Sequence, residues 1–205
     1  MIRDGLGALL SQDKDLQVVG AAPDGRTAIE MVRTLTPDVV IMDIGMHDMN
    51  GVDATRRIKS DHENVKVIAL SMYSDKRYVY HMLDAGAQGY VLKSAAADEL
   101  IEAVRAVRSG KTYVSRELAD CMLERSSHPG SAHDGSVYSR LGAREREVLQ
   151  LVSEGKTSAE TAKEMHISVK TVETHRRNIA RKLGLHSTAE LTKYAVREGL
   201  TSLEA

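Results

Sequence analysis

The segment PDVVIMDIGMH, residues 37–47, is a strand-length run of apolar residues that stops on a carboxylate, Asp43, with a loop at Gly45 behind it. An ionised group is costly inside a buried strand, so we expect Asp43 at the end of the strand. A helix cap, a metal ligand and a residue that reacts are all open as its role. The segments around it decide among them.

Short β-branched runs alternate with helix-length amphipathic segments through the first 124 residues. Strands that are apolar on both faces, each followed by a helix, indicate a parallel sheet covered on both sides. The sequence predicts an α/β, doubly wound domain over residues 1–124. Its predicted strands are residues 16–22, 38–43, 65–71 and 89–94, and its predicted helices are residues 4–11, 25–35, 51–60, 75–85 and 96–109.

The chain then changes character. The stretch from Arg125 to Arg140 is rich in Ser, Gly, Pro and His, which is typical of a linker, and we place the linker at residues 125–137. Residues 138–205 have no strand pattern and predict four short helices. Only His166, Ile167 and Ser168 separate the helices predicted at 158–165 and 169–183, which is the spacing of a helix-turn-helix.

Composition and charge narrow the class of protein. The formal net charge of -1 hides an asymmetry, because residues 125–205 hold 13 Lys and Arg against 10 Asp and Glu. The single cysteine, Cys121, lies on a predicted helix, provides no disulfide framework and is interpreted as a small buried residue. No apolar run is long enough to span a bilayer, and Asp4 interrupts any signal peptide, so we expect a cytoplasmic protein without a membrane partner.

Three predicted strands end on polar residues: Asp43, Ser71 and Lys93. In an open parallel sheet the carboxyl ends of the strands meet at one edge, where chemistry is expected. A carboxylate can attack a phosphoryl group, while an amine and a hydroxyl can bind the oxygens of the product. The set therefore favours a phosphoacceptor site. Tyr90 is either a second reporter of the same site or a tyrosine at the edge of the core.

The second helix of the helix-turn-helix has the charge pattern of a DNA-reading helix. The segment from Lys170 to Lys182 holds five cations against one anion, Glu173. Val172 and Ile179 lie seven residues apart and Leu183 lies four further on, which predicts one face packed on the core. Residues 170, 173, 174 and 177 share the opposite face. There Arg177 suits guanine and Glu173 suits the cytosine amino group.

These residues stand in motifs that resemble a known family: PDVVIMDIGMHDMNGVDATRRI, VIALSMYSD, GAQGYVLKSA and AREREVLQLVSEGKTSAETAKEMHISVKTVETHRRNIARKLGLHS. Residues 4–124 resemble the flavodoxin-like receiver domain of two-component response regulators, and residues 138–203 resemble a LuxR-type helix-turn-helix, together the NarL/FixJ family. The resemblance implies that Asp43 is the phosphoacceptor, Ser71 the switch hydroxyl, Tyr90 the switch aromatic and Lys93 the phosphate-pairing lysine. For DNA binding it implies Lys170, Thr171, Glu173, Thr174, His175, Arg177, Arg181 and Lys182.

The resemblance also implies function and partners. A transcription regulator of this kind is not an enzyme, is switched by phosphorylation from a sensor histidine kinase, uses Mg²⁺ at Asp43, binds promoter DNA and acts on RNA polymerase. The family dimerises on DNA through its final helix, here residues 188–197. The other interpretation of that helix, from Leu191, Tyr194 and Ala195, is packing within its own domain.

The sequence departs from the family pattern in three respects. His47 stands where a proline is usual, and Gly142 stands where a Thr or Ser caps a helix. The first strand and its pair of acidic residues are absent, so we expect Asp43 to bind Mg²⁺ weakly unless Asp48 or a main-chain carbonyl contributes. We therefore expect Met1 to be internal to a longer product, with about 10 further residues forming that strand.

Three other functions fit parts of the sequence. One is a DNA-binding regulator with a degenerate receiver that works without phosphorylation. Another is a small phosphatase or phosphotransferase that uses Asp43 as its nucleophile, although no second catalytic carboxylate accompanies it. The third is an RNA-binding antiterminator, which is disfavoured because no aromatic residue lies among the basic residues to stack on bases.

Overall fold

The computed structural model describes residues 2–72, 74–95, 97–118 and 136–201. The chain splits into two compact units, one of residues 1–44 and 51–128 and the other of residues 45–50 and 129–205. Cys121 and residues 125–135 of the predicted linker lie outside the described residues. The last residue of that linker, Val137, is already helical, because Ser136 caps a short helix that begins there.

The first unit contains a four-stranded parallel sheet in the order β1 (Val39–Asp43), β2 (Lys66–Ser71), β3 (Gly89–Leu92) and β4 (Tyr113–Val114). Three of the predicted strands and the parallel α/β class are confirmed. The strand β4 was not predicted, since two residues give no periodic pattern. In the register of the sheet, Asp43 lies opposite Leu70, and Ser71 lies opposite Leu92.

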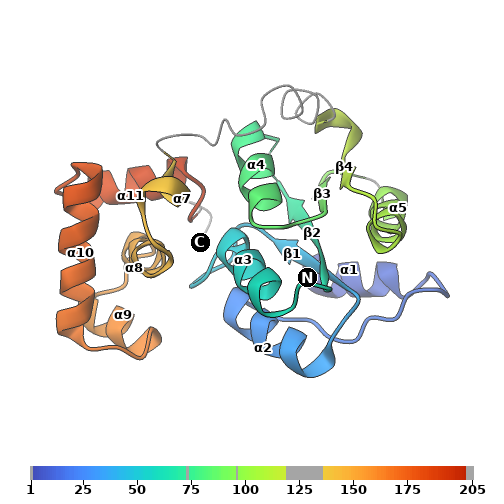
Figure 1. Ribbon diagram of the computed structural model, residues 1–205, viewed down its shortest axis with the longest axis horizontal. Coiled ribbons are helices and arrows are strands. Elements are labelled where there is room, and N and C mark those ends of the chain that lie inside the picture. The colour runs from blue at the N-terminus through green and yellow to red at the C-terminus, as the bar shows by residue number, and fades with distance from the viewer. Residues whose placement is uncertain (1, 73, 96, 119–135, 202–205) are drawn as a thin grey trace. The chain divides into compact units, whose positions relative to one another are not determined.

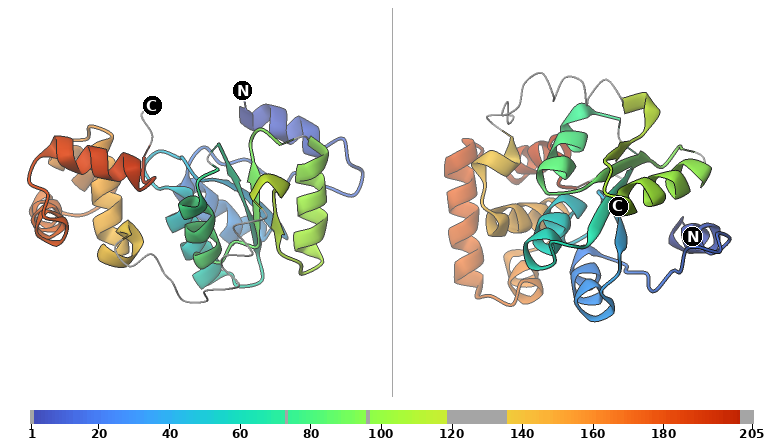
Figure 2. Two further views of the ribbon diagram at one scale, coloured as in Figure 1. Left: turned by 90° about the horizontal axis from the view of Figure 1, so that it is seen from above. Right: turned by 45° about the vertical axis from the view of Figure 1, so that its right-hand side comes forward.

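Helices cover both faces of this sheet (Figures 1 and 2). On one face lie α2 (Gly25–Leu35), α3 (Gly51–Asp61) and α4 (Lys76–Asp84), and on the other lie α1 (Ile2–Leu10) and α5 (Ala97–Arg108). A single turn of 3-10 helix, Arg116–Leu118, follows β4. The core beneath α5 consists of Ile68, Leu70, Val91, Leu100, Ala103, Val104 and Val107, with Leu6 and Leu10 of α1 packed against it.

The strand predicted at residues 16–22 is wrong. These residues have no regular secondary structure, and Val18 and Val19 are 40% and 49% exposed. A β-branched run forms a strand only where a neighbouring strand offers hydrogen-bond partners. Within the described part of the chain, the ladder of β1 is formed with β2, and no strand lies between β1 and residues 16–22 to pair with them.

The helices of the second unit are α7 (Val137–Arg140), α8 (Ala143–Ser153), α9 (Ser158–Glu164), α10 (Val169–Leu183) and α11 (Thr188–Arg197). The four predicted helices are confirmed, and α7 is an addition. Capping boxes at Thr157 with Glu160 and at Ser187 with Glu190 start α9 and α11, as predicted. The apolar faces meet in one core that includes Val148, Leu149, Leu151, Val152, Val172, Ile179, Leu183 and Leu200.

The turn between α9 and α10 gives the unit its helix-turn-helix. Met165 caps the end of α9, and the Ser168 side chain accepts a hydrogen bond from the Thr171 amide at the start of α10. Between them His166 adopts a left-handed conformation with φ 53°, while Ile167 packs against the core. The short turn therefore fixes the direction in which α10 leaves α9.

Candidate phosphoacceptor site and nucleic-acid interface

The carboxyl ends of β1, β2 and β3 bring three predicted residues together. Nζ of Lys93 lies 2.5 Å from Oδ2 of Asp43, and the Lys93 amide donates a hydrogen bond of 2.7 Å to the carbonyl oxygen of Ser71. Ser71 is buried, whereas the side chains of Asp43 and Lys93 are 37% and 16% exposed. An open carboxylate beside a less accessible ammonium is an arrangement that can accept and then hold an anionic group.

A glycine missed by the sequence analysis sets the shape of this edge. A β carbon on Gly51, the first residue of α3, would lie 2.0 Å from the carbonyl oxygen of Asp43. Only glycine lets the start of α3 approach the backbone of Asp43 so closely. The Gly51 amide also donates a hydrogen bond to the Ile44 carbonyl, 2.9 Å away. A glycine eight residues after the acidic residue, at a helix start, was the only sequence signal for it.

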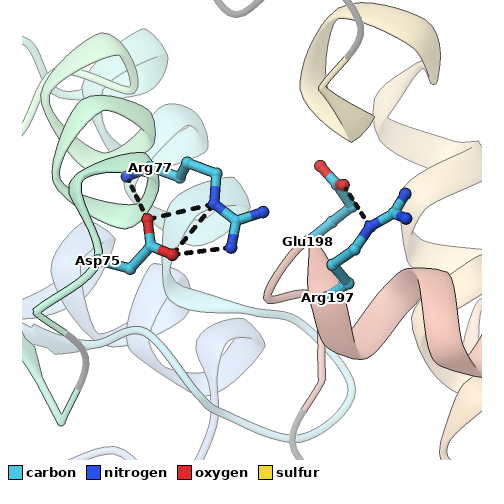
Figure 3. A network of polar contacts seen from close by, with 4 residues as sticks. All are labelled: Asp75, Arg77, Arg197 and Glu198. Atoms are coloured by element: carbon cyan, nitrogen blue, oxygen red, sulfur yellow. Dashed lines mark hydrogen bonds and ion pairs between the residues drawn. The ribbon is translucent and has the colours of Figure 1, made fainter.

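The segment after Ser71 runs from the sheet edge into α4. Asp75 caps α4 by accepting a hydrogen bond from the Arg77 amide, and the Arg77 guanidinium approaches Oδ2 of Asp75 to 2.7 Å (Figure 3). Both side chains are more than two-fifths exposed, so solvent screens the pair and it adds little stability. Tyr90 on β3 is fully buried in this structure.

The described residues do not fit a metal site built from several carboxylates around Asp43. Receiver domains generally use Mg²⁺, which prefers an octahedron of oxygen ligands with carboxylates among them. Within the described ranges no group of three or more His, Cys, Asp or Glu residues lies close enough to hold a metal ion. Asp43 therefore remains a predicted Mg²⁺ ligand without the acidic companions that would make it a strong one.

The helix α10 has one buried face and one exposed, basic face. Val172, Ile179 and Leu183 are buried in the core, as the spacing predicted. His175 is half-buried. The other residues predicted to bind DNA are all exposed: Lys170, Thr171, Glu173, Thr174, Arg177, Arg181 and Lys182.

The polar side chains on this helix differ in the hydrogen bonds and ion pairs that they make within the protein. Neither Arg177 nor Lys170 makes a side-chain hydrogen bond or ion pair within the part of the chain that the structure describes. Arg181 donates to Oδ1 of Asn178 at 3.1 Å. Nζ of Lys182 lies 2.6 Å from Oε2 of Glu145, so its charge is shared with the start of α8.

The helix α11 uses its apolar residues inside its own domain. Leu191, Tyr194 and Ala195 are buried in the common core. At its end Arg197 pairs with Glu198 at 3.3 Å (Figure 3). The packing that was one interpretation of this helix is therefore present.

Comparison with known proteins shows the family of this chain. Residues 1–105 match the response regulator receiver domain, and residues 139–195 match the luxR family of bacterial regulatory proteins. The oxygen regulatory protein NreC of Staphylococcus aureus strain MRSA252 is 36% identical over 204 residues, 98% of this chain and 94% of NreC. No described helix is long and apolar enough to cross a membrane.

Two solved structures are similar over both units. RcsB of Salmonella enterica serovar Typhimurium, bound to promoter rprA in the presence of the phosphomimetic BeF3-, is 26% identical with a TM-score of 0.59, covering 94% of this chain and 92% of RcsB. The response regulator ChrA of a heme-sensing two-component system is 32% identical with a TM-score of 0.50, covering 97% of this chain and 92% of ChrA.

A parallel sheet with a carboxylate and a lysine at its carboxyl edge, joined to a helix-turn-helix, defines a response regulator that binds DNA. The chain belongs to the NarL/FixJ family of two-component response regulators. Its function is regulation of transcription, switched by phosphorylation.

Proposed function

We propose that Asp43 is the phosphoacceptor of this response regulator and that the basic face of α10 reads promoter DNA. The observation that supports the first assignment best is the 2.5 Å approach of Lys93 to Asp43 from a strand two places away in the sheet. It gives the carboxylate a cationic partner where the charge of a phosphoryl group would accumulate.

The reaction is transfer of a phosphoryl group from a sensor histidine kinase. One Asp43 oxygen attacks phosphorus, a phosphorus–oxygen bond to Asp43 forms, and the bond from phosphorus to the donor nitrogen breaks, with its electron pair leaving on the donor. The acyl phosphate carries about -1.5 to -2 charge by analogy with other phosphorylated side chains. Lys93 then pairs with one phosphoryl oxygen, and the Ser71 hydroxyl donates to another.

Binding of the phosphoryl group by Ser71 is the step that would move the protein. Ser71 ends β2 and is followed directly by the segment leading to α4. A shift of that segment would change the surface of the receiver around α4, and we assign Tyr90, three residues before Lys93, as the switch aromatic. The phosphoryl group stays on the chain as a signal, so the protein is a regulator and not an enzyme.

On DNA, α10 would enter the major groove. Arg177 and Glu173 read base edges, and Thr174 lies beside them on the same face. Phosphate contacts come from Lys170, Thr171, His175, Arg181 and Lys182, which set the register on the duplex. RcsB, a relative of known structure, was solved as dimers on DNA, which supports a homodimer here as well.

The remaining partners follow from this role. The kinase, the promoter and RNA polymerase all meet in the cytoplasm, where we place the protein. The proposed domain limits are residues 1–124 for the receiver, 125–137 for the linker and 138–205 for the DNA-binding domain.

The decisive experiment compares DNA affinity with and without phosphorylation. Duplexes selected from a random library by the full chain are titrated by fluorescence anisotropy before and after treatment with acetyl phosphate. The proposal expects tighter specific binding after treatment. Specific binding of equal strength in both states would instead favour the regulator that works without phosphorylation.

A further inference from the structure

A serine on the first helix of the helix-turn-helix contacts the recognition helix. Ser158 is the first residue of α9, directly after the Thr157 cap. Its hydroxyl donates a hydrogen bond to Oε1 of Glu173 on α10, and it accepts one of 2.9 Å from Nη1 of Arg176. Both partners lie on α10, so one hydroxyl links an anion and a cation of that helix to the helix before it.

Glu173 is the only acidic residue from Lys170 to Lys182. A carboxylate on a helix face that approaches DNA is repelled by the phosphates, and it helps recognition only when it is aimed at a donor such as the cytosine amino group. A free glutamate side chain also loses rotamer freedom on binding, which costs affinity. Its contribution therefore depends on its being held in place beforehand.

The bond to Ser158 supplies that hold and leaves an acceptor free. Oε1 of Glu173 is engaged by the serine, while Oε2 has no hydrogen-bond partner among the residues that the structure describes. The guanidinium of Arg176, one turn along the same helix, places positive charge on the other side of the hydroxyl.

We propose that Ser158 is a positioning residue that sets base preference, because in each subunit it fixes the Glu173 carboxylate for one base pair of the half-site. The proposal rests on the proposed role of α10 in reading DNA. Ser158 touches no base in this account and acts only through Glu173. Losing it would affect one base pair of each half-site and leave the remaining specificity unchanged.

Stability and helix formation are not expected to depend on this hydroxyl. The capping box of α9 is formed by Thr157 and Glu160, and the Thr157 side chain accepts from the Glu160 amide without help from Ser158. Alanine is also the better helix former at an ordinary helical position. Ser158→Ala should therefore fold like the parent chain, which makes its effect on DNA readable.

The test uses the full chain and duplexes selected by it from a random library, with each base pair of the preferred duplex then substituted in turn. Ser158→Ala is expected to reduce discrimination about five- to tenfold at one base pair of each half-site and to leave binding to random duplex and its salt dependence unchanged. Ser158→Thr, which keeps the hydroxyl, should restore the preference. Glu173→Ala should lose preference at the same base pair, and adding Ser158→Ala to it should change nothing more.

Three kinds of outcome overturn the inference. Unchanged discrimination in Ser158→Ala, or a further loss in the double variant, would show that the serine does not act through Glu173. A uniform loss at all base pairs with a lowered melting temperature would show a structural role instead. If the parent chain shows no base preference at all, the proposed function fails together with the inference, which distinguishes that case from the other two.

Discussion

Lys93 and Asp43 lie fifty residues apart in the sequence and on strand ends separated by β2, yet Nζ of Lys93 approaches Oδ2 of Asp43 to 2.5 Å. Because Asp43 is more than one-third exposed, solvent screens the pair, and it is expected to add about 1 kcal/mol or less to stability. Its proposed value is chemical, as the cation that receives the phosphoryl group.

Lys93→Ala is therefore expected to alter the switch more than the fold. The free energy of unfolding measured in urea should change by about 1 kcal/mol or less. The gain in DNA affinity after acetyl phosphate treatment should be lost. Lys66→Ala is the matched control and should keep the gain, because Lys66 begins β2 and so lies at the edge of the sheet opposite to Asp43 and Lys93. An unimpaired gain in Lys93→Ala would contradict the role of this lysine.

Gly51→Ala tests the close approach of α3 to Asp43. A methyl group there would lie 2.0 Å from the Asp43 carbonyl oxygen, so the backbone must shift. We expect the free energy of unfolding measured in urea to fall by about 1 to 3 kcal/mol, and phosphate uptake to be slower. Gly7→Ala in α1, where a β carbon would meet nothing within 4 Å, is the control and should not destabilise the chain. Equal behaviour of the two variants would argue against a tight junction at Gly51.

The sequence predicted the elements whose apolar pattern is periodic, and it failed where partners decide. The strands β1, β2 and β3 and the helices α2 to α5 and α8 to α11 followed from their spacing and caps, whereas β4 and α7 did not. Residues 16–22 have the composition of a strand, but among the described residues no strand lies beside them to pair with, and composition does not reveal this. The bond from Ser158 to Glu173 was equally invisible, because it depends on the angle between two helices.

We expect Glu145 to make the stability of the DNA-binding unit depend on pH. Burial raises the pKa of Glu145, but hydrogen bonds from Lys182 and from the Gly142 amide outweigh burial, so the pKa lies below its ordinary value. Because the pKa of Glu145 is lower in the folded state, its charge stabilises the fold at any pH above the unfolded-state pKa of about 4.3. This stability is lost as the pH falls through the folded-state pKa.

Glu145→Gln should accordingly lower the melting temperature of the full chain by about 2 to 5 °C at pH 7. The difference between variant and parent should shrink as the solution is made more acidic than pH 4, because the parent then loses the same charge. Thermal unfolding followed by circular dichroism measures both values. A difference that stays constant across this range would show that the carboxylate charge is not responsible.

Arg177→Ala and Arg181→Ala should separate base reading from phosphate contact. If about four cations per subunit of a dimer neutralise phosphates, log K should fall with log salt at a slope of roughly -7. Arg177→Ala is expected to cost about 1 to 3 kcal/mol on the preferred duplex and to relax base preference. Arg181→Ala should weaken preferred and random duplexes alike and make the slope shallower by about 2, because each subunit of the dimer loses one contact. Equal losses on both duplexes for both variants would contradict this division.

The most direct test of the account is to locate the phosphoryl group. The full chain is treated with radiolabelled acetyl phosphate, and the label is followed through hydroxylamine treatment, which cleaves acyl phosphates. We predict a hydroxylamine-sensitive label in the parent chain and none in Asp43→Asn, with the peptide containing residues 38–43 as its location. Label of the same amount and sensitivity in Asp43→Asn would show that another residue is the phosphoacceptor.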